Sequence, residues 1–200
     1  MSMRTRPFGE RGVTTRRWRG VRAALLVPGL FLCAQARANP PEARMQITSS
    51  SFTHQGAIPA KYTCEGPDTS PPLAWSGVPA TAKSLALIVD DPDAPDPAAP
   101  RMTWVHWVLY DIPVAASGLP QGATSSALPK GTREGRNDWD RTGYGGPCPP
   151  VGRHRYFHKL YALDTVLPDL REPDKAALEK AMKGHIIAET QLVGTYQKAK

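Results

Sequence analysis

Three stretches of the chain combine apolar, β-branched and aromatic residues, and clusters of Pro or Gly bound each of them. They are residues 84–90 (SLALIVD), 103–112 (TWVHWVLYDI) and 154–163 (HRYFHKLYAL). Runs of this length and composition are typical of β-strands. The Pro- and Gly-rich segments that separate the runs are predicted to form ordered loops, because their composition does not suit a β-ladder. These segments are residues 91–100, 113–136 and 143–153.

The C-terminal tail has a different pattern. Residues 173–183 have Pro at their start and Gly184 just past their end, which is the arrangement that begins and ends a helix. Residues 185–198 place apolar and β-branched side chains at roughly helical spacing, so we expect a second helix there. Strands followed by helices predict a mainly β fold, a sandwich with a helical C-terminal appendage.

The first 38 residues have the order of a secretory signal peptide. Several Arg residues precede a 12-residue apolar run, Ala23 to Ala34, and the small-residue pattern Ala36-Arg37-Ala38 follows it. We expect cleavage after Ala38 and a periplasmic or secreted protein. The apolar run is shorter than the roughly 20 residues of a membrane helix, so no stable membrane insertion is expected after cleavage.

Two features of this leader leave alternatives open. The Arg16-Arg17 pair allows the twin-arginine route as well as general secretion. Cys33 makes a lipoprotein signal an alternative, although Leu32 is not the small residue that such signals place before the Cys. After cleavage we expect an exposed lead-in over residues 39–46 and one domain over residues 47–200.

The distribution of charge argues against a nucleic-acid-binding surface on the folded domain. The formal net charge is +7, but residues 1–38 contain eight Arg and one Glu, and the remaining chain carries as many acidic as basic side chains. Binding to a phosphate backbone needs a basic surface on the folded part. The 21 Pro and 17 Gly residues agree with a turn-rich β protein. Cleavage would leave Cys64 and Cys148, and two cysteines in an exported domain favour a disulfide.

Candidate chemistry lies on two of the predicted strands. Because side chains alternate between the faces of a strand, residues 104, 106, 108 and 110 are expected to share one face. By the same rule His154, Tyr156, His158 and Leu160 share a face. Two histidines and a tyrosine could therefore meet across neighbouring strands, although a core histidine would be the ordinary explanation for His106.

The spacing of the candidate residues gives little support to a metal site or a hydrolytic active site. On a strand, His154 and His158 would lie about 13 Å apart, too far to bind one zinc ion. Prolines and a missing Gly spoil the resemblance of residues 91–96 to a calcium loop. No nucleophile elbow, zinc-protease helix or phosphate-binding loop is present. The loop of residues 143–150 (GYGGPCPP) is suited to holding an anion, or simply to a rigid crossover.

Four ordered motifs resemble the phosphatidylethanolamine-binding proteins, also called Raf kinase inhibitor proteins. They are residues 91–95 (DPDAP), 104–107 (WVHW), 146–150 (GPCPP) and 154–156 (HRY). Further signatures resemble the bacterial YbhB/YbcL branch of that family. These are residues 62–66 (YTCEG), 70–75 (SPPLAW), 136–139 (RNDW) and 182–185 (MKGH).

The resemblance implies a β-sandwich of two antiparallel sheets with a small cavity for phosphate-like or carboxylate groups. Carried over position by position, it assigns ten ligand-binding residues. They are Asp91, Pro92, Asp93, Pro95, Trp104, His106, Gly146, Pro149, His154 and Tyr156. Imidazole, phenol and loop N–H groups would donate to the anion, and Asp91 would orient His106 or accept from a ligand's ammonium group.

The resemblance also places Cys64 and Cys148 near the pocket mouth. It therefore predicts a disulfide that braces the loop of residues 143–150, which we call the anion loop. Together these observations predict an exported, non-enzymatic binding protein for a small anionic or phosphorylated ligand, with no cofactor and no metal. A protein modulator that uses the pocket rim, such as a kinase or protease inhibitor, is the alternative. A hydrolase that uses His106 and Asp91 is a third and weaker reading.

Overall fold

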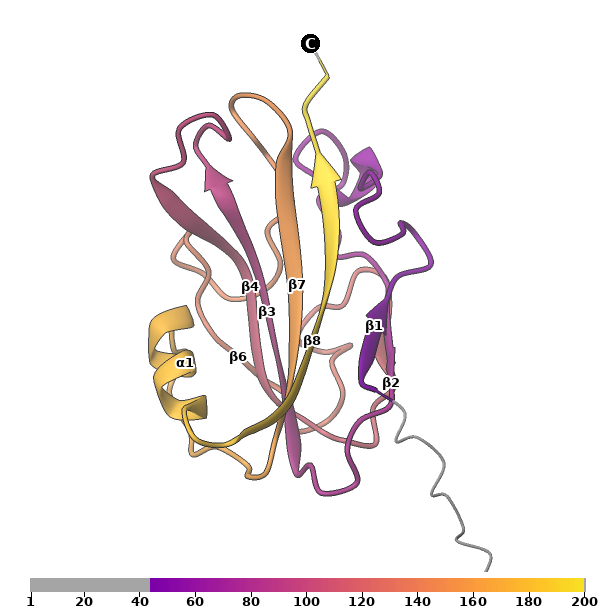
Figure 1. Cartoon of the computed structure of the whole chain (residues 1–200), viewed down its shortest axis with the longest axis vertical. Helices are drawn as coiled ribbons and strands as arrows, with labels where there is room; N and C mark the ends of the chain where they lie inside the picture. Colours follow the sequence, from indigo (N-terminus) through magenta and orange to yellow (C-terminus); the bar gives the residue numbers. More distant parts are fainter. Residues whose placement is uncertain (1–43, 200) are drawn as a thin grey trace, which may run out of the picture. The chain divides into compact units, whose positions relative to one another are not determined.

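The computed structural model describes residues 44–199, which form two antiparallel sheets packed face to face. The larger sheet has the strand order β6-β4-β3-β7-β8 (Figure 1), and the smaller sheet has the order β1-β2-β5. The larger sheet contains β3 (Ser84–Ala94), β4 (Met102–Ile112), β6 (Arg133–Glu134), β7 (His154–Leu163) and β8 (Ile186–Tyr196). The smaller sheet contains β1 (Gln46–Thr48), β2 (Leu73–Ser76) and β5 (Gly118–Leu119). The predicted sandwich of two antiparallel sheets is confirmed.

The main core lies between the two sheets. Ile47 and Trp75 from the smaller sheet pack in one cluster with Leu87, Trp107 and Leu160 from the larger one. These side chains are nearly inaccessible to solvent, and their burial is the main favourable contribution to the fold. The sheets are thus held together by residues of the three apolar runs that the sequence marks as strands.

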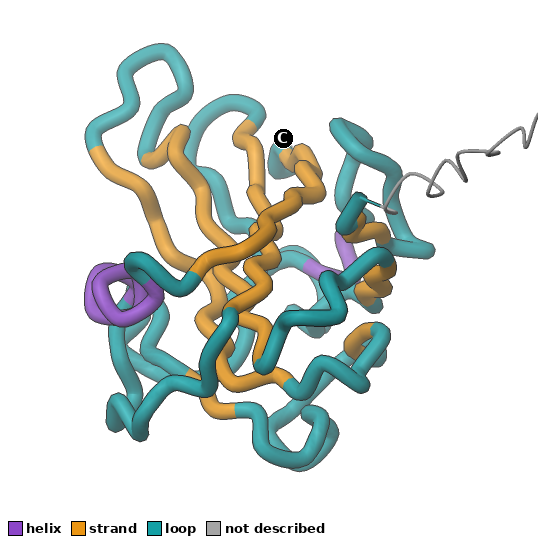
Figure 2. The backbone as a smooth tube through the Cα atoms, turned by 60° about the horizontal axis from the view of Figure 1, so that its bottom comes forward, coloured by secondary structure: helices purple, strands orange, loops and turns teal. Residues whose placement is uncertain are grey.

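A second cluster lies on the outer face of the larger sheet, where helix α1 (Lys175–Met182) covers it. Leu178 and Met182 of the helix pack against Ile88, Val108 and Tyr110. In Figure 2 the helix lies beside the strands of this sheet, and loops make up most of the remaining chain. A short 3-10 helix, η1 (Ala60–Tyr62), completes the elements.

The expected first C-terminal helix is present and capped as its sequence suggests. The side chain of Asp174 accepts a hydrogen bond from the Ala177 N–H at 2.7 Å, and Gly184 follows the helix with a positive φ of 86°. None of the helices among residues 44–199 has the length and apolar character needed to cross a membrane.

The second expected helix, over residues 185–198, is wrong because most of this segment forms β8. Strand β8 pairs with β7 from His154↔Tyr196 to Leu163↔Ile186. The segment is rich in β-branched residues, which suit a strand, and its apolar positions fit either period. Pairing with β7 decides between them.

Two other boundaries also differ from the prediction. Strand β3 runs on through residues 91–94, which were expected to be loop, and its pairing with β4 is irregular there. Residues 113–136, also expected to be loop, contain the two-residue strands β5 and β6. Of the expected lead-in, Met45 is buried and Gln46 begins β1, so these two residues belong to the fold. The signal peptide and residues 39–43 lie outside the described residues.

A β-bulge at His106 changes which residues of β4 share a face. Val89 pairs with Trp107 while Asp90 pairs with Val105, so His106 is an extra residue on β4. As a result Trp107 joins the core between the sheets, and Val108 and Tyr110 lie under the helix. The expectation that residues 104, 106, 108 and 110 share one face is therefore wrong beyond His106.

Candidate functional site

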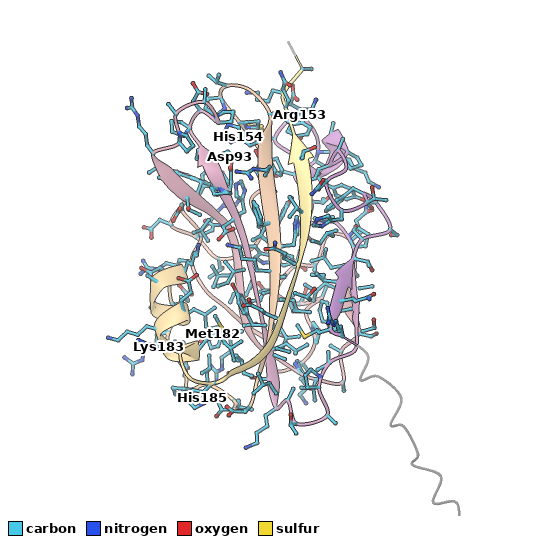
Figure 3. The ribbon with its side chains drawn as sticks, in the orientation of Figure 1. Asp93, Arg153, His154, Met182, Lys183 and His185 are labelled. Carbon is cyan, nitrogen blue, oxygen red and sulfur yellow. A yellow bond between two sulfur atoms is a disulfide. The ribbon has the colours of Figure 1, made fainter. Side chains whose placement is uncertain are left out.

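A pocket of about 350 Å³ lies where β3, β4 and β7 meet the loop of residues 143–153. Figure 3 shows His154 and Asp93 at this end of the larger sheet, whereas Met182 and His185 lie at the opposite end. Eleven residues line the pocket. They are Asp91, Ala94, Pro95, Met102, Trp104, His106, Trp139, Cys148, Pro149, Pro150 and His154.

His106 occupies the bulge of β4 and is held by reciprocal hydrogen bonds to the loop. Its Nδ1 lies 2.7 Å from the carbonyl oxygen of Gly145, and the Gly145 N–H donates to the His106 carbonyl at 3.0 Å. The other ring nitrogen, Nε2, is buried and has no hydrogen-bond partner among the described residues. Burial lowers the pKa of His106 from 6.5 to about 4, so the ring is neutral at pH 7.

Asp91 and His154 form a buried pair that connects β3 to β7. The Asp91 Oδ2 atom lies 2.7 Å from Nδ1 of His154, and Nε2 of His154 lies 2.9 Å from the Val151 carbonyl oxygen. Both nitrogens of His154 therefore face acceptor oxygens. Burial raises the pKa of Asp91, and the His154 hydrogen bond only partly offsets the effect.

Two further polar groups near this end of the sheet lack hydrogen bonds of ordinary geometry. The phenol of Tyr156 and the indole N–H of Trp104 are buried without such a bond within the described chain, although Asp91 lies close enough to the Tyr156 hydroxyl to affect its pKa. The Tyr156 ring lies 5.1 Å from the ring of His106 and is stacked on His154 at 6.4 Å. Burial raises the pKa of Tyr156, so its hydroxyl keeps its proton and can donate.

Asp93 was expected at the pocket but turns toward Arg155 instead. The Nε and Nη2 atoms of Arg155 donate to the two Asp93 oxygens at 2.9 and 2.6 Å. These hydrogen bonds hold the pKa of Asp93 below its ordinary value. The Asp93 N–H also donates to Asp91 Oδ1 at 2.8 Å, so Asp93 braces the pocket carboxylate from behind.

Gly146 was expected on the rim and anion loop of the pocket, but its N–H is already bonded within the protein. The Gly146 N–H donates to the side chain of Asp68 at 2.7 Å, and the Gly145 N–H is used by His106. A Cβ at Gly146 would lie 2.5 Å from the carbonyl oxygen of Tyr62, so glycine is needed here for close packing. The anion loop presents Cys148 and Pro149 to the pocket rather than its glycine amides.

The expected disulfide is confirmed. Cys64 and Cys148 are bonded, with their Cα atoms 5.4 Å apart. The Cys64 N–H donates to the Pro147 carbonyl at 3.1 Å, and the Tyr144 hydroxyl donates to the Tyr62 carbonyl at 2.9 Å. The loop that carries Cys148 is therefore held against residues 62–68 by covalent and hydrogen bonds.

The structure brings together six of the ten expected ligand-binding residues on the pocket lining. They are Asp91, Pro95, Trp104, His106, Pro149 and His154. Tyr156 lies behind the lining, in contact with two of these residues, while Pro92, Asp93 and Gly146 lie outside it.

Sequence reasoning missed Trp139, whose ring lies 5.4 Å from Trp104 and 5.2 Å from His106. It also missed Ala94, Met102 and Pro150 on the lining. Trp139 belongs to the quoted RNDW signature, and this was the available signal.

The pocket combines an apolar wall with a polar floor. Neither Lys nor Arg is among its lining residues. Within residues 44–199 no group of three or more His, Cys, Asp and Glu is arranged to hold a metal ion. Three buried groups, the imidazole of His106, the phenol of Tyr156 and the indole of Trp104, have unused hydrogen-bonding capacity here. Such a site can receive one small polar group attached to an apolar body.

Comparisons with known proteins agree with this architecture. The sequence model of the family described as phosphatidylethanolamine-binding protein matches residues 48–197. A UPF0098 protein of Methanothermobacter thermautotrophicus is 47% identical over 155 residues, which are 77% of this chain and 99% of that protein.

Solved structures give the same result. The crystal structure of CT736 from Chlamydia trachomatis, a phosphatidylethanolamine-binding protein homolog, is 44% identical, has a TM-score of 0.72 and covers 78% of this chain and 99% of its own. E. coli YbcL is 33% identical, with a TM-score of 0.71, and covers 78% and 100%. A carboxypeptidase Y inhibitor, solved with its cognate proteinase, is 17% identical with a TM-score of 0.51 and shares the fold alone. The family match and these relatives show that the chain belongs to the phosphatidylethanolamine-binding protein family.

Proposed function

We propose that this protein is an exported binding protein whose pocket receives a small acidic group, phosphoryl or carboxylate, of a larger ligand. The observation that supports this function is that Trp104 and His106, which line the largely apolar pocket, have buried polar atoms without hydrogen-bond partners among the described residues. Each buried polar group without a hydrogen bond costs about 1–3 kcal/mol. A ligand that supplies the missing partners recovers this free energy.

The walls of the pocket suit an apolar neighbour of that acidic group. Pro95, Met102, Trp139 and Pro149 line it, and its volume is at the lower end for a small-molecule site. With no lysine or arginine on the lining, the acidic group would be held by neutral donors, so we expect modest affinity.

A binding role fits the site better than a hydrolytic one. The Asp91–His154 pair has the geometry of a carboxylate and an imidazole, but Nε2 of His154 is occupied by the Val151 carbonyl and faces no nucleophile. The nearby Cys148 is tied in the disulfide and cannot attack a substrate. Hydrolysis would need a nucleophile from another source.

Export is part of the same proposal. The disulfide between Cys64 and Cys148 favours an oxidising compartment, because cytosolic thiols are kept reduced. The Arg-rich leader with its short apolar run agrees with this. Expression with the leader intact, followed by N-terminal sequencing of the exported protein, should give a chain that begins at Asn39 and has no free thiol. A full-length reduced protein would contradict export.

The binding function is tested by NMR titration of the exported, processed protein with phosphate, phosphoethanolamine and acetate. We expect saturable shifts of the His106 ring signals, and their loss in His106→Ala. His185→Ala, at the opposite end of the larger sheet, is the matched control and should leave the response unchanged (Figure 3). Histidine signals that do not move at millimolar ligand would contradict the proposal.

A second function, docking of a protein partner on the pocket rim, is favoured by one observation. Met102, Trp139 and Val151 are exposed by 53%, 40% and 55% around the mouth, which leaves an apolar rim in solvent. The carboxypeptidase Y inhibitor, which has the same fold, was solved bound to its proteinase. Inhibition of a serine carboxypeptidase that is lost in Trp139→Asp and kept in His106→Ala would support this function. Inhibition lost in neither variant, or no inhibition, would count against it.

A further inference from the structure

The hydrogen bond from His106 to Gly145 determines which nitrogen of this ring lacks a proton. A carbonyl oxygen can only accept, so Nδ1, at 2.7 Å from it, carries the hydrogen. In the neutral ring Nε2 then has a lone pair. His106 lines the pocket, and its Nε2 has no donor among the described residues, so a ligand atom that reaches Nε2 meets an acceptor, not a donor.

The groups around His106 keep the ring neutral at pH 7. From β7, His154 and His158 disfavour a positive charge on it, and Tyr156 packs on it as a neutral phenol. From β3, Asp90 favours the charge, while Asp91 is paired with His154. Burial is the main cause of the lowered pKa of His106 and outweighs the Gly145 hydrogen bond and Asp90, which favour the charged ring.

A fully deprotonated oxygen would therefore meet a lone pair at Nε2. Contact between the two becomes favourable only when one proton lies between them, supplied either by an O–H of the ligand or by uptake from water. The two routes end in the same complex, which contains the protein, the ligand anion and one proton. Trp104, which also lines the pocket, has an unpartnered indole N–H that can donate to another oxygen of the same group.

We propose that the pocket selects a phosphate monoester that carries one proton, and that it discriminates against sulfate esters and phosphate diesters, which have no such proton. A phosphate monoester has its second pKa near 6, so it carries an O–H in the range where His106 is neutral. A carboxylate, with a pKa near 4, must take up the proton from water at the same pH. This inference rests on the proposed acid-binding function and narrows its ligand class.

Phenyl phosphate and phenyl sulfate form a matched pair of probes. Both have the same apolar ring, but only the phosphate can carry an O–H proton near pH 6. We expect calorimetry on the exported protein at pH 6 to show at least tenfold tighter binding of phenyl phosphate. Above pH 7 its affinity should fall about tenfold per pH unit, as one proton is taken up with it. Measurements in two buffers of different ionisation enthalpy should show uptake that approaches one proton per site at pH 8.

Equal affinity for the sulfate, or an affinity for phenyl phosphate that does not change with pH, would overturn the inference while leaving acid binding intact. Binding of neither probe would instead overturn the proposed function. The tautomer itself is tested without any ligand, by long-range nitrogen–proton NMR of the histidine rings at pH 7. An Nε2–H form of His106 would refute the argument directly.

His106→Gln separates the role of the proton from the shape of the site. A glutamine amide can donate without titrating, so this variant should bind both probes with similar affinity and lose the pH dependence. Its circular dichroism spectrum reports whether the fold is retained. His185→Gln, at the other end of the sheet, should keep the tenfold preference and the pH dependence. A preference for phosphate that persists in a folded His106→Gln protein would exclude His106 as its source.

Discussion

Three histidines buried in the larger sheet differ in how many of their nitrogens have partners. His154 uses both, with Asp91 and the Val151 carbonyl, while His106 uses one, with the Gly145 carbonyl. His158 makes no hydrogen bond of ordinary geometry among the described residues and packs against the ring of Phe52 at 5.5 Å, although the backbones of Tyr156 and Leu192 lie close enough to affect its pKa. The number of partners distinguishes the paired His154, the half-bonded His106 on the pocket lining and the core residue His158, although all three histidines are almost completely buried.

Replacement of His158 by Leu should not destabilise the protein at pH 8. Because His158 makes no hydrogen bond of ordinary geometry, an apolar side chain in its place loses none, and the free energy of unfolding should stay the same or rise. His154→Leu is the matched control and should cost about 3–5 kcal/mol, because Asp91 is left buried without its partner. Urea unfolding of both variants measures the difference. Equal losses in the two variants would show that His158 has polar partners.

Gly146→Ala should weaken the anion loop even though it changes no lining residue. The added Cβ would meet Asp68 and the backbone of residues 62–63, and such overpacking costs about 1–3 kcal/mol. We expect a lower unfolding midpoint and shifted NMR signals of His106, whose Nδ1 is held by the adjacent Gly145. Gly122→Ala is the control for an open position, since no heavy atom lies within 4 Å of its Cβ position, although its positive φ adds some strain. A Gly146→Ala protein no less stable than this control would contradict the close packing.

At the scale of elements, the pocket depends on one bulge and one tethered loop. The bulge turns His106 toward the pocket and still lets Trp107 fill the core. The loop of residues 143–153 closes the site, and its contacts with residues 62–68 set its position. A regular strand would have placed Val108 on the pocket face and left Trp107 under the helix.

Removal of the disulfide in the double variant Cys64→Ser/Cys148→Ser should lower stability by about 2–5 kcal/mol, because the bond joins segments 84 residues apart. The Gly146–Asp68 and Cys64–Pro147 hydrogen bonds remain. We therefore expect the pocket to persist, with phenyl phosphate affinity reduced less than tenfold at temperatures where the protein is folded. Urea unfolding with and without reductant measures the first effect, and calorimetry the second. Unchanged unfolding of the reduced wild-type protein would contradict this role of the disulfide.

For the whole molecule, the buried histidines make stability dependent on pH. Burial lowers the pKa of His106 and of His158 from 6.5 to about 4. The unfolded chain then takes up protons at a higher pH than the folded one, so this contribution to stability is complete above pH 6.5 and is lost as the pH falls toward 4. The raised pKa of Asp91 acts in the opposite direction at the acidic end of this range.

We expect the free energy of unfolding to decrease between pH 6.5 and pH 4.5 with a slope approaching that of two protons. One proton corresponds to about 1.4 kcal/mol per pH unit. Urea titrations at several pH values measure the slope, and His158→Leu should reduce it by about half. A slope that is the same in the variant and the wild type would show that His158 does not titrate in this range.

The strands that carry the site were predictable because their signal is local. The apolar runs of residues 84–90, 103–112 and 154–163 have the length and composition of buried strands, and Pro and Gly end them. Asp174 and Gly184 bound a helix by rules that act within one turn. Ordered motifs predicted the family and, through it, the disulfide and most of the lining.

What the sequence alone could not determine depends on contacts between distant segments. Strand β8 was misread as a helix because its pattern allows both periods and only pairing with β7 selects one. Trp139 reaches the pocket, and the Gly146 N–H is taken by Asp68, 78 residues away in the chain. The tautomer of His106 follows from a carbonyl 39 residues away. Local patterns determine which residues form strands, turns and the helix, whereas the partner of each buried polar atom is decided when the folded chain brings remote groups within hydrogen-bonding distance.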